Sequence, residues 1–173
     1  LCFEELIYSE SSTISWPKLD ERAASSLCYT SGTTGNPKGV LYSHRSILLH
    51  TFGMLTFAAD VGLTPSSTVL PVVPLFHANA WGLPFAVPLV GAKLVFPGAA
   101  LDGASLFSLM DKERVKAAWG VPTIWLGLLA EMRKQKRKPQ EFSFMLSGGS
   151  AVPRSMIEEL EKEFGVDVTH GWG

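Results

Sequence analysis

Residues 29–40 combine side chains and backbone groups that suit the binding of a polyphosphate. The glycines and the proline exclude a regular helix or strand, so this stretch predicts a tight loop with accessible backbone N–H groups. Hydroxyl groups and one ammonium group complete a set of donors that phosphate oxygens accept from. The residues that carry these groups are Thr30, Ser31, Gly32, Thr33, Thr34, Gly35 and Lys38. An ordinary Gly/Ser/Thr hairpin loop is the alternative interpretation, and neither a Walker loop nor a dinucleotide fingerprint is present.

Three further groups follow stretches that predict strands. Residues 77–82 hold His77 and Trp81, residues 148–150 hold two glycines before Ser150, and residues 170–172 place a glycine before an aromatic ring. Open α/β sheets bind ligands beyond the carboxyl ends of their strands, and glycines let a flat ring approach the backbone. Core packing of the aromatic residues and ordinary glycine turns are the alternatives.

Alternating elements are predicted to position these groups. The apolar residues before the loop and residues 40–43 after it predict a hairpin. A helix is expected from Ser43 to about residue 59, apolar on most sides and therefore buried. From there the pattern predicts strands at 69–73, 93–96, 116–119, 144–146 and 166–169, and helices ending near 90, 112, 136 and 164. This alternation indicates an α/β fold with a mainly parallel, doubly wound sheet and helices on both faces.

Composition narrows the class of protein. The 173 residues are 46% apolar with a net charge of −1, which gives no support for nucleic-acid binding. A basic run at residues 133–138 is interpreted as the end of a helix. Prolines interrupt the uncharged residues 61–92, so no transmembrane segment is expected. Two cysteines and no dense ligand motif favour a reducing, cytoplasmic location without a structural metal.

The loop at residues 29–40 resembles the signature of the adenylate-forming enzymes, which include acyl-CoA synthetases, peptide-synthetase adenylation domains and luciferase. The His-x-Asn-Ala-Trp of residues 77–81 is similar to the acyl-pocket motif of medium- and long-chain fatty acyl-CoA synthetases. The resemblance implies that Lys38 and His77 are catalytic, that Thr30 lies near Mg²⁺, and that residues at 148–150 and 170–172 bind adenine. The implied nucleotide-binding residues outside the loop are Gly148, Gly149, Ser150, His170, Gly171 and Trp172. The implied acid pocket consists of His77, Ala78, Asn79, Trp81 and Gly82.

The same resemblance implies a reaction. ATP and a fatty acid would give acyl-AMP and pyrophosphate, and coenzyme A would then give acyl-CoA and AMP. Residues 1–173 are expected to be an internal part of the large AMP-binding N-terminal domain, without the C-terminal lid and inactive alone. A homodimer of the full-length protein is compatible with the resemblance. An aryl-CoA ligase, an amino-acid adenylation domain and a non-catalytic nucleotide-binding module remain alternatives, although residues 79–85 lack the acid that an amino group would need.

Overall fold

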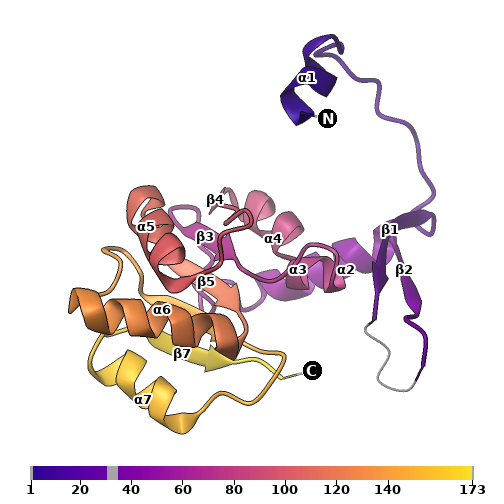
Figure 1. The fold of residues 1–173 in the computed structure, drawn as a ribbon. Coiled ribbons are helices and arrows are strands. Elements are labelled where there is room, and N and C mark those ends of the chain that lie inside the picture. Colours follow the sequence, from indigo (N-terminus) through magenta and orange to yellow (C-terminus); the bar gives the residue numbers. More distant parts are fainter. Residues whose placement is uncertain (1, 31–34, 173) are drawn as a thin grey trace.

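The computed structural model describes residues 2–30 and 35–172 and consists of a hairpin joined to a layered α/β body (Figure 1). Strands β1 (Ala24–Tyr29) and β2 (Gly39–Ser43) pair antiparallel, with Cys28 opposite Val40, so the predicted hairpin is confirmed. Helix α1 (Phe3–Tyr8) lies apart from the body at the end of an extended, exposed linker (Figure 1).

The body contains a five-stranded parallel sheet in the order β4-β3-β5-β6-β7. The strands are β3 (Thr68–Pro71), β4 (Lys93–Leu94), β5 (Ala117–Gly120), β6 (Phe144–Ser147) and β7 (Asp167–His170). The helices are α2 (His44–Leu55), α3 (Ala78–Trp81), α4 (Leu83–Val90), α5 (Gly103–Glu113), α6 (Pro122–Gln135) and α7 (Arg154–Lys162). The chain runs from β3 outward to β4 and then crosses to β5 on the other side of β3, which creates a switch point between β3 and β5.

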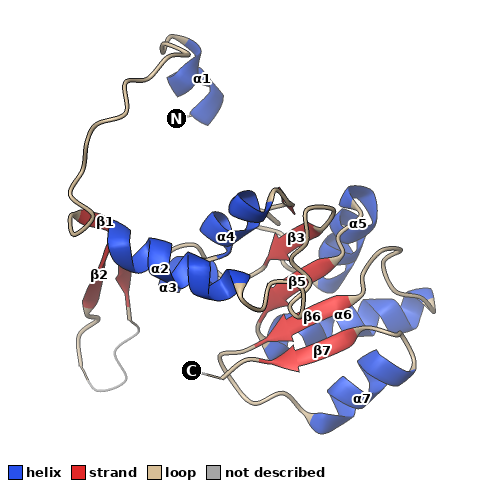
Figure 2. Cartoon of the chain, turned by 180° about the vertical axis from the view of Figure 1, so that it is seen from behind, coloured by secondary structure: helices blue, strands red, loops and turns tan. Residues whose placement is uncertain are grey.

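Helices cover both faces of this sheet, as the alternating pattern predicts (Figure 2). Leu106, Trp125 and Leu160 bring α5, α6 and α7 against one face. Met54 and Leu83 bring α2 and α4 against the other. Because successive strand residues point to opposite faces, Ala117 and Trp119 of β5 belong to the second layer while Ala118 belongs to the first.

Two expectations about local structure were wrong. Helix α2 is not buried: among its residues only Thr51 and Met54 are, while Leu48, Leu49 and Phe52 are at least half exposed. The helix expected to end near residue 90 is divided into α3 and α4, because residues 78–82 all have positive φ angles and wind in the left-handed sense. A hydrophobicity pattern reports side-chain polarity. It therefore predicts neither the exposure of α2 nor the left-handed backbone of residues 78–82.

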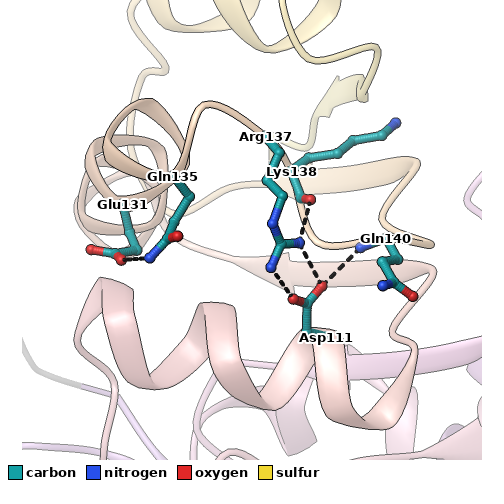
Figure 3. Close-up of polar contacts among 6 residues, drawn as sticks. All are labelled: Asp111, Glu131, Gln135, Arg137, Lys138 and Gln140. Atoms are coloured by element: carbon teal, nitrogen blue, oxygen red, sulfur yellow. Dashed lines mark hydrogen bonds and ion pairs between the residues drawn. The ribbon is translucent and has the colours of Figure 1, made fainter.

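Two residues of the basic run at 133–138, Arg133 and Arg137, form ion pairs with neighbouring helices. Figure 3 shows the Arg137 guanidinium on Asp111 of α5, with Nη2 2.5 Å from Oδ2 and Nη1 3.1 Å from Oδ1. The Gln140 N–H donates to the same carboxylate, and Arg137 also lies over the Phe107 ring. The hydrogen bonds from Arg137 lower the pKa of Asp111 below its ordinary value, although partial burial opposes this shift. Arg133 makes a second such pair with Glu159 of α7.

Candidate functional site

All four groups of candidate residues lie at turns that follow strands. Tyr29 ends β1 before the loop, and the left-handed turn follows β3. The glycine turn begins after Ser147, the last residue of β6, and the terminal turn follows His170 of β7. Ser147 is paired with both Gly120 and His170, so the carboxyl ends of β5, β6 and β7 are level with one another.

The loop between β1 and β2 is closed at its base by two hydrogen bonds. The Thr30 N–H donates to the Lys38 carbonyl at 2.9 Å, and the Lys38 N–H donates to Thr30 Oγ1 at 3.3 Å. Thr30, Gly35 and Lys38 are exposed, which leaves the Lys38 ammonium and the Thr30 O–H accessible to a ligand. Ser31, Gly32, Thr33 and Thr34 lie outside the described residues, so their proposed roles stay predictions.

The left-handed turn of α3 is a costly backbone conformation. The φ angles of Ala78, Asn79, Ala80 and Trp81 lie between 46° and 56°, and Gly82 follows at 82°. Left-handed helical geometry costs about 1–2 kcal/mol for each residue that carries a Cβ. Burial of apolar side chains compensates this backbone cost, since Ala80 and Leu83 are completely buried. Strain of this kind is concentrated at functional sites in proteins, which makes the turn a candidate site on geometry alone.

A cavity of about 310 Å³ lies between this turn and helix α2. From the turn it is lined by Ala78, Asn79, Trp81 and Gly82, all of which the sequence assigned to an acid pocket. The remaining lining residues are Tyr42, Ser46, Ile47, His50 and Phe85. These five were not predicted, although Ser46 and Ile47 precede His50 by four and three residues, so both share a helix face with it.

Two histidines near the turn, His50 and His77, differ in their relation to this cavity. The His50 ring lines the cavity, and its Nε2 is 3.4 Å from the Trp81 carbonyl oxygen. A Cβ on Gly82 would be 2.6 Å from that ring, so only glycine fits there while the histidine stays in place. His77 is exposed, and its backbone N–H donates to the Pro74 carbonyl. It is not among the residues that line this cavity, and its catalytic role stays a prediction.

The glycine turn and the terminal turn share a second cavity, also of about 310 Å³. Its lining residues are Gly149, Ser150, Ala151, His170, Gly171 and Trp172. Gly149 has a φ of 79°, and His170 Nε2 is 3.3 Å from the Ser150 carbonyl oxygen. The Trp172 side chain is 97% exposed, so its ring is available for stacking on a ligand. The structure thus brings together two groups that lie about twenty residues apart in the sequence.

Trp81 connects the first cavity to the glycine turn. A Cβ on Gly148 would lie 3.0 Å from Cη2 of Trp81 and 3.1 Å from the Gly171 carbonyl oxygen. The indole is therefore packed against the glycine turn, and Gly148 is buried beneath it. Trp81 of the first cavity thus lies against Gly148, the sequence neighbour of Gly149 in the second cavity.

The donors at the site fit anionic ligands. Neither cavity has an aspartate or glutamate among its lining residues. Within residues 2–30 and 35–172, no three His, Cys, Asp or Glu side chains are grouped as a metal site. The Thr30 hydroxyl, close to Lys38, suits Mg²⁺ that is held mainly by nucleotide phosphates, because this ion keeps few protein ligands in such sites.

The fold is an α/β domain with a parallel sheet, and the candidate residues gather at turns beyond the carboxyl ends of its strands, where such sheets bind ligands. A family model described as AMP-binding enzyme matches residues 3–173, and the chain belongs to this family. The sequence-based assignment to the adenylate-forming enzymes is thereby confirmed.

Individual relatives agree with this assignment. The chain is 53% identical over 174 residues to a medium-chain-fatty-acid–CoA ligase of Ectopseudomonas oleovorans, which covers 100% of this chain and 32% of the relative. It is 50% identical to a 3-methylmercaptopropionyl-CoA ligase of Ruegeria pomeroyi, covering 99% of this chain and 32% of the relative. The chain thus spans about a third of the length of these relatives.

A solved structure supports the fold along the whole chain. The anthranilate CoA ligase AuaEII in complex with anthranoyl-AMP superposes with a TM-score of 0.86 at 26% identity. The superposition covers 100% of this chain and 33% of AuaEII.

Proposed function

We propose that this chain forms the ATP- and acid-binding part of an acyl-CoA synthetase that activates a fatty acid through acyl-AMP. The observation that supports the proposal is the contact of Trp81, which lines the cavity proposed for the acid, with Gly148, which adjoins Gly149 of the cavity proposed for adenine. The products would be acyl-CoA, AMP and pyrophosphate.

The first half of this reaction needs alignment and charge neutralisation more than proton transfer. A carboxylate is already ionised at neutral pH, so it can attack the α-phosphate without a general base. As pyrophosphate leaves, negative charge builds on its oxygens, and the Lys38 ammonium with the loop hydroxyls and N–H groups would stabilise it. The accessible position of Lys38 beside Thr30 supports this role. Mg²⁺ bound with ATP near Thr30 would add positive charge to the phosphates.

The acid is proposed to be a fatty acid without an amino group. Apolar residues Ile47, Trp81 and Phe85 line the cavity between α2 and the turn, and its lining has no carboxylate that could pair with an ammonium group. The 53%-identical relative is named for medium-chain fatty acids. The 50%-identical relative is named for 3-methylmercaptopropionate, so a short thioether acid is a second candidate that a substrate panel would distinguish.

The organisation of the whole protein is also a proposal. Residues 1–173 would form part of the large N-terminal domain, with a C-terminal lid and the coenzyme A site supplied by sequence outside this chain. We propose a cytoplasmic location, which the reduced cysteines Cys2 and Cys28 support. Among the described residues, none of the helices combines the length and apolar character of a membrane span. A homodimer stays a prediction that light scattering of the full-length protein would test.

Acid-dependent exchange of pyrophosphate with ATP tests the proposed function directly. A full-length protein that contains this chain should catalyse the exchange with saturated acids and should release AMP when coenzyme A is added. The panel should include acids of graded chain length, 3-methylmercaptopropionate, an aromatic acid and an amino acid. Exchange with the amino acid alone would replace the proposal by an adenylation domain, and nucleotide binding without any exchange would indicate a non-catalytic module.

A further inference from the structure

We propose that Asn79 is a positioning residue whose side-chain amide ties the left-handed turn, and with it Trp81, to the strand that enters the phosphate loop. The inference rests on the proposed function for its effect on catalysis. It changes the role of Asn79 from a group that contacts the acid to one that acts through Trp81.

Two hydrogen bonds connect the Asn79 side chain to β1. Its Nδ2 donates to Ser26 Oγ at 3.0 Å, and its Oδ1 accepts from Cys28 Sγ at 3.4 Å. Both partners lie more than fifty residues earlier in the chain. A primary amide is suited to this place because it offers a donor and an acceptor side by side.

The geometry of β1 explains why Ser26 and Cys28 both form hydrogen bonds with the Asn79 amide. Ser26 and Cys28 are two positions apart in a strand, so both side chains point to the same face. Cys28 is buried there, with 4% of its surface exposed. Thr30, which closes the base of the phosphate loop with Lys38, follows Cys28 by two residues.

The backbone of the turn also favours asparagine at this position. Asn79 has φ 50° and ψ 44°, a left-handed conformation that asparagine adopts more readily than most residues with a Cβ. Its neighbours Ala78 and Ala80 lack polar side chains that could hold the turn against β1. Among the three, the Asn79 amide is thus the polar side chain that connects the turn to the hairpin.

The other end of the turn reaches the glycine turn after β6. Trp81 follows Asn79 by two residues, and its ring is packed against Gly148. A rigid turn of five residues therefore links β1, which carries the phosphate loop, with the place where adenine is proposed to lie. Loss of the amide would release one end of this connection and let Trp81 shift relative to both cavities.

A glycine substitution distinguishes the effect of the side-chain amide from the effect of the left-handed backbone conformation. Asn79→Gly keeps the left-handed conformation accessible and removes the bridging amide together with its part of the cavity lining, whereas Ser26→Ala weakens the bridge and leaves that lining in place. Ser26→Ala removes one partner, and Ser25→Ala on the same strand is the matched control, because Ser25 makes no contact with this amide among the described hydrogen bonds. Two measurements in a full-length protein are needed: acid-dependent exchange with acids of graded length, and the rate at which the Cys28 thiol reacts with a maleimide, followed by mass spectrometry of its peptide.

Asn79→Gly should raise the KM for the acid about tenfold and change the chain-length profile, with a smaller change in KM for ATP. Cys28 should react at least about five times faster, because its hydrogen bond and its cover are lost. Ser26→Ala should give a partial effect, and adding it to Asn79→Gly should give little more. Ser25→Ala should match the wild type in both measurements.

The outcomes separate this inference from the proposed function. Unchanged labelling of Cys28 in Asn79→Gly would refute the bridge. Faster labelling with an unchanged KM and chain-length profile, or a loss of thermal stability alone, would show a structural residue and overturn the positioning role. A wild-type protein without acid-dependent exchange would overturn the proposed function, and the labelling would still decide whether the amide holds the turn on β1.

Discussion

Lys38 is the basic residue of the phosphate loop, and its charge can be removed without disturbing the core. It is exposed, and its contacts with Thr30 use backbone atoms that a substitution retains. In the full-length protein, Lys38→Ala should lower acid-dependent pyrophosphate exchange by roughly 100-fold, since removal of one oriented charge donor costs about 3 kcal/mol in the transition state. The thermal unfolding midpoint should stay within about 1 °C, because surface substitutions change stability little.

Lys112→Ala is the control for this substitution, because Lys112 is an exposed lysine at the end of α5, away from the loop. Equal exchange rates in Lys38→Ala and the wild type would remove Lys38 from the proposed site.

A substitution of Gly148 that adds one methyl group tests the contact between Trp81 and the glycine turn. An added methyl group would lie 3.0 Å from Trp81 and 3.1 Å from a backbone oxygen of Gly171, so at least one of them must move. Gly148→Ala should raise the KM for both the acid and ATP, each by about fivefold to tenfold. Steady-state kinetics would measure this, with Gly53→Ala on α2 as the control, where nothing lies within 4 Å of the new methyl group. An increase for neither substrate would show that Trp81 adjusts without effect on the site.

At the scale of elements, α5 and α6 touch through two glycines in an asymmetric way. A Cβ on Gly103 would be 2.1 Å from the Gly127 carbonyl oxygen, whereas a Cβ on Gly127 would be 3.6 Å from its nearest neighbour. Gly103→Ala should therefore destabilise the protein by about 2–3 kcal/mol, as overpacking does. Gly127→Ala should be neutral or stabilising by up to about 1 kcal/mol, because alanine is the better helix former. Denaturant unfolding of both variants measures the difference, and equal effects would contradict this close approach.

The Asp111–Arg137 pair joins α5 to the segment after α6 and should contribute stability that depends on pH. Its carboxyl has a folded pKa below the ordinary 3.8, so the contribution is complete above that value and is lost as the pH falls through the lower, folded pKa. Asp111→Asn should cost about 1 kcal/mol at pH about 7, and this cost should shrink as the pH falls below 3.8 and through the folded pKa. The free energy of unfolding of Arg137→Gln, measured by denaturant titration, should likewise approach that of the wild type as the pH falls. A constant difference at all pH values would mean that the pair is not the cause.

The sequence allowed the parallel sheet to be predicted because apolar runs such as residues 69–73 and 144–146 alternate with helical patterns. It also singled out Gly149, Trp81 and Trp172 through the family resemblance, and these residues line the two cavities. The left-handed turn could not be predicted, since Ala78 and Ala80 adopt that backbone only when burial compensates the cost. Tyr42 and His50 were missed for a related reason: whether a helix residue faces a cavity depends on the partner packed against it.

At the scale of the whole molecule, an apolar face lies open over α2 and α4. Leu48, Phe52 and Leu89 are each at least half exposed, and a groove of about 630 Å³ runs between Leu48 and Leu89. Contiguous apolar surface of this kind favours association, whereas single exposed apolar residues are common and neutral. The chain spans about a third of the length of its relatives. In a protein of their length, further sequence could therefore cover this apolar face.

The isolated chain should therefore self-associate as its concentration rises. Changing Leu48 and Phe52 together to lysine should shift the association midpoint at least about tenfold upward, because two partly buried apolar contacts of about 1 kcal/mol each are lost. Sedimentation velocity over a range of concentrations measures this. Leu126→Lys is the matched control: it removes an apolar residue that is 49% exposed on α6, at a distance from the groove, and should leave the midpoint unchanged. A chain that stays monomeric at every concentration, or one that responds equally to all three lysines, would show that the α2–α4 face does not drive association.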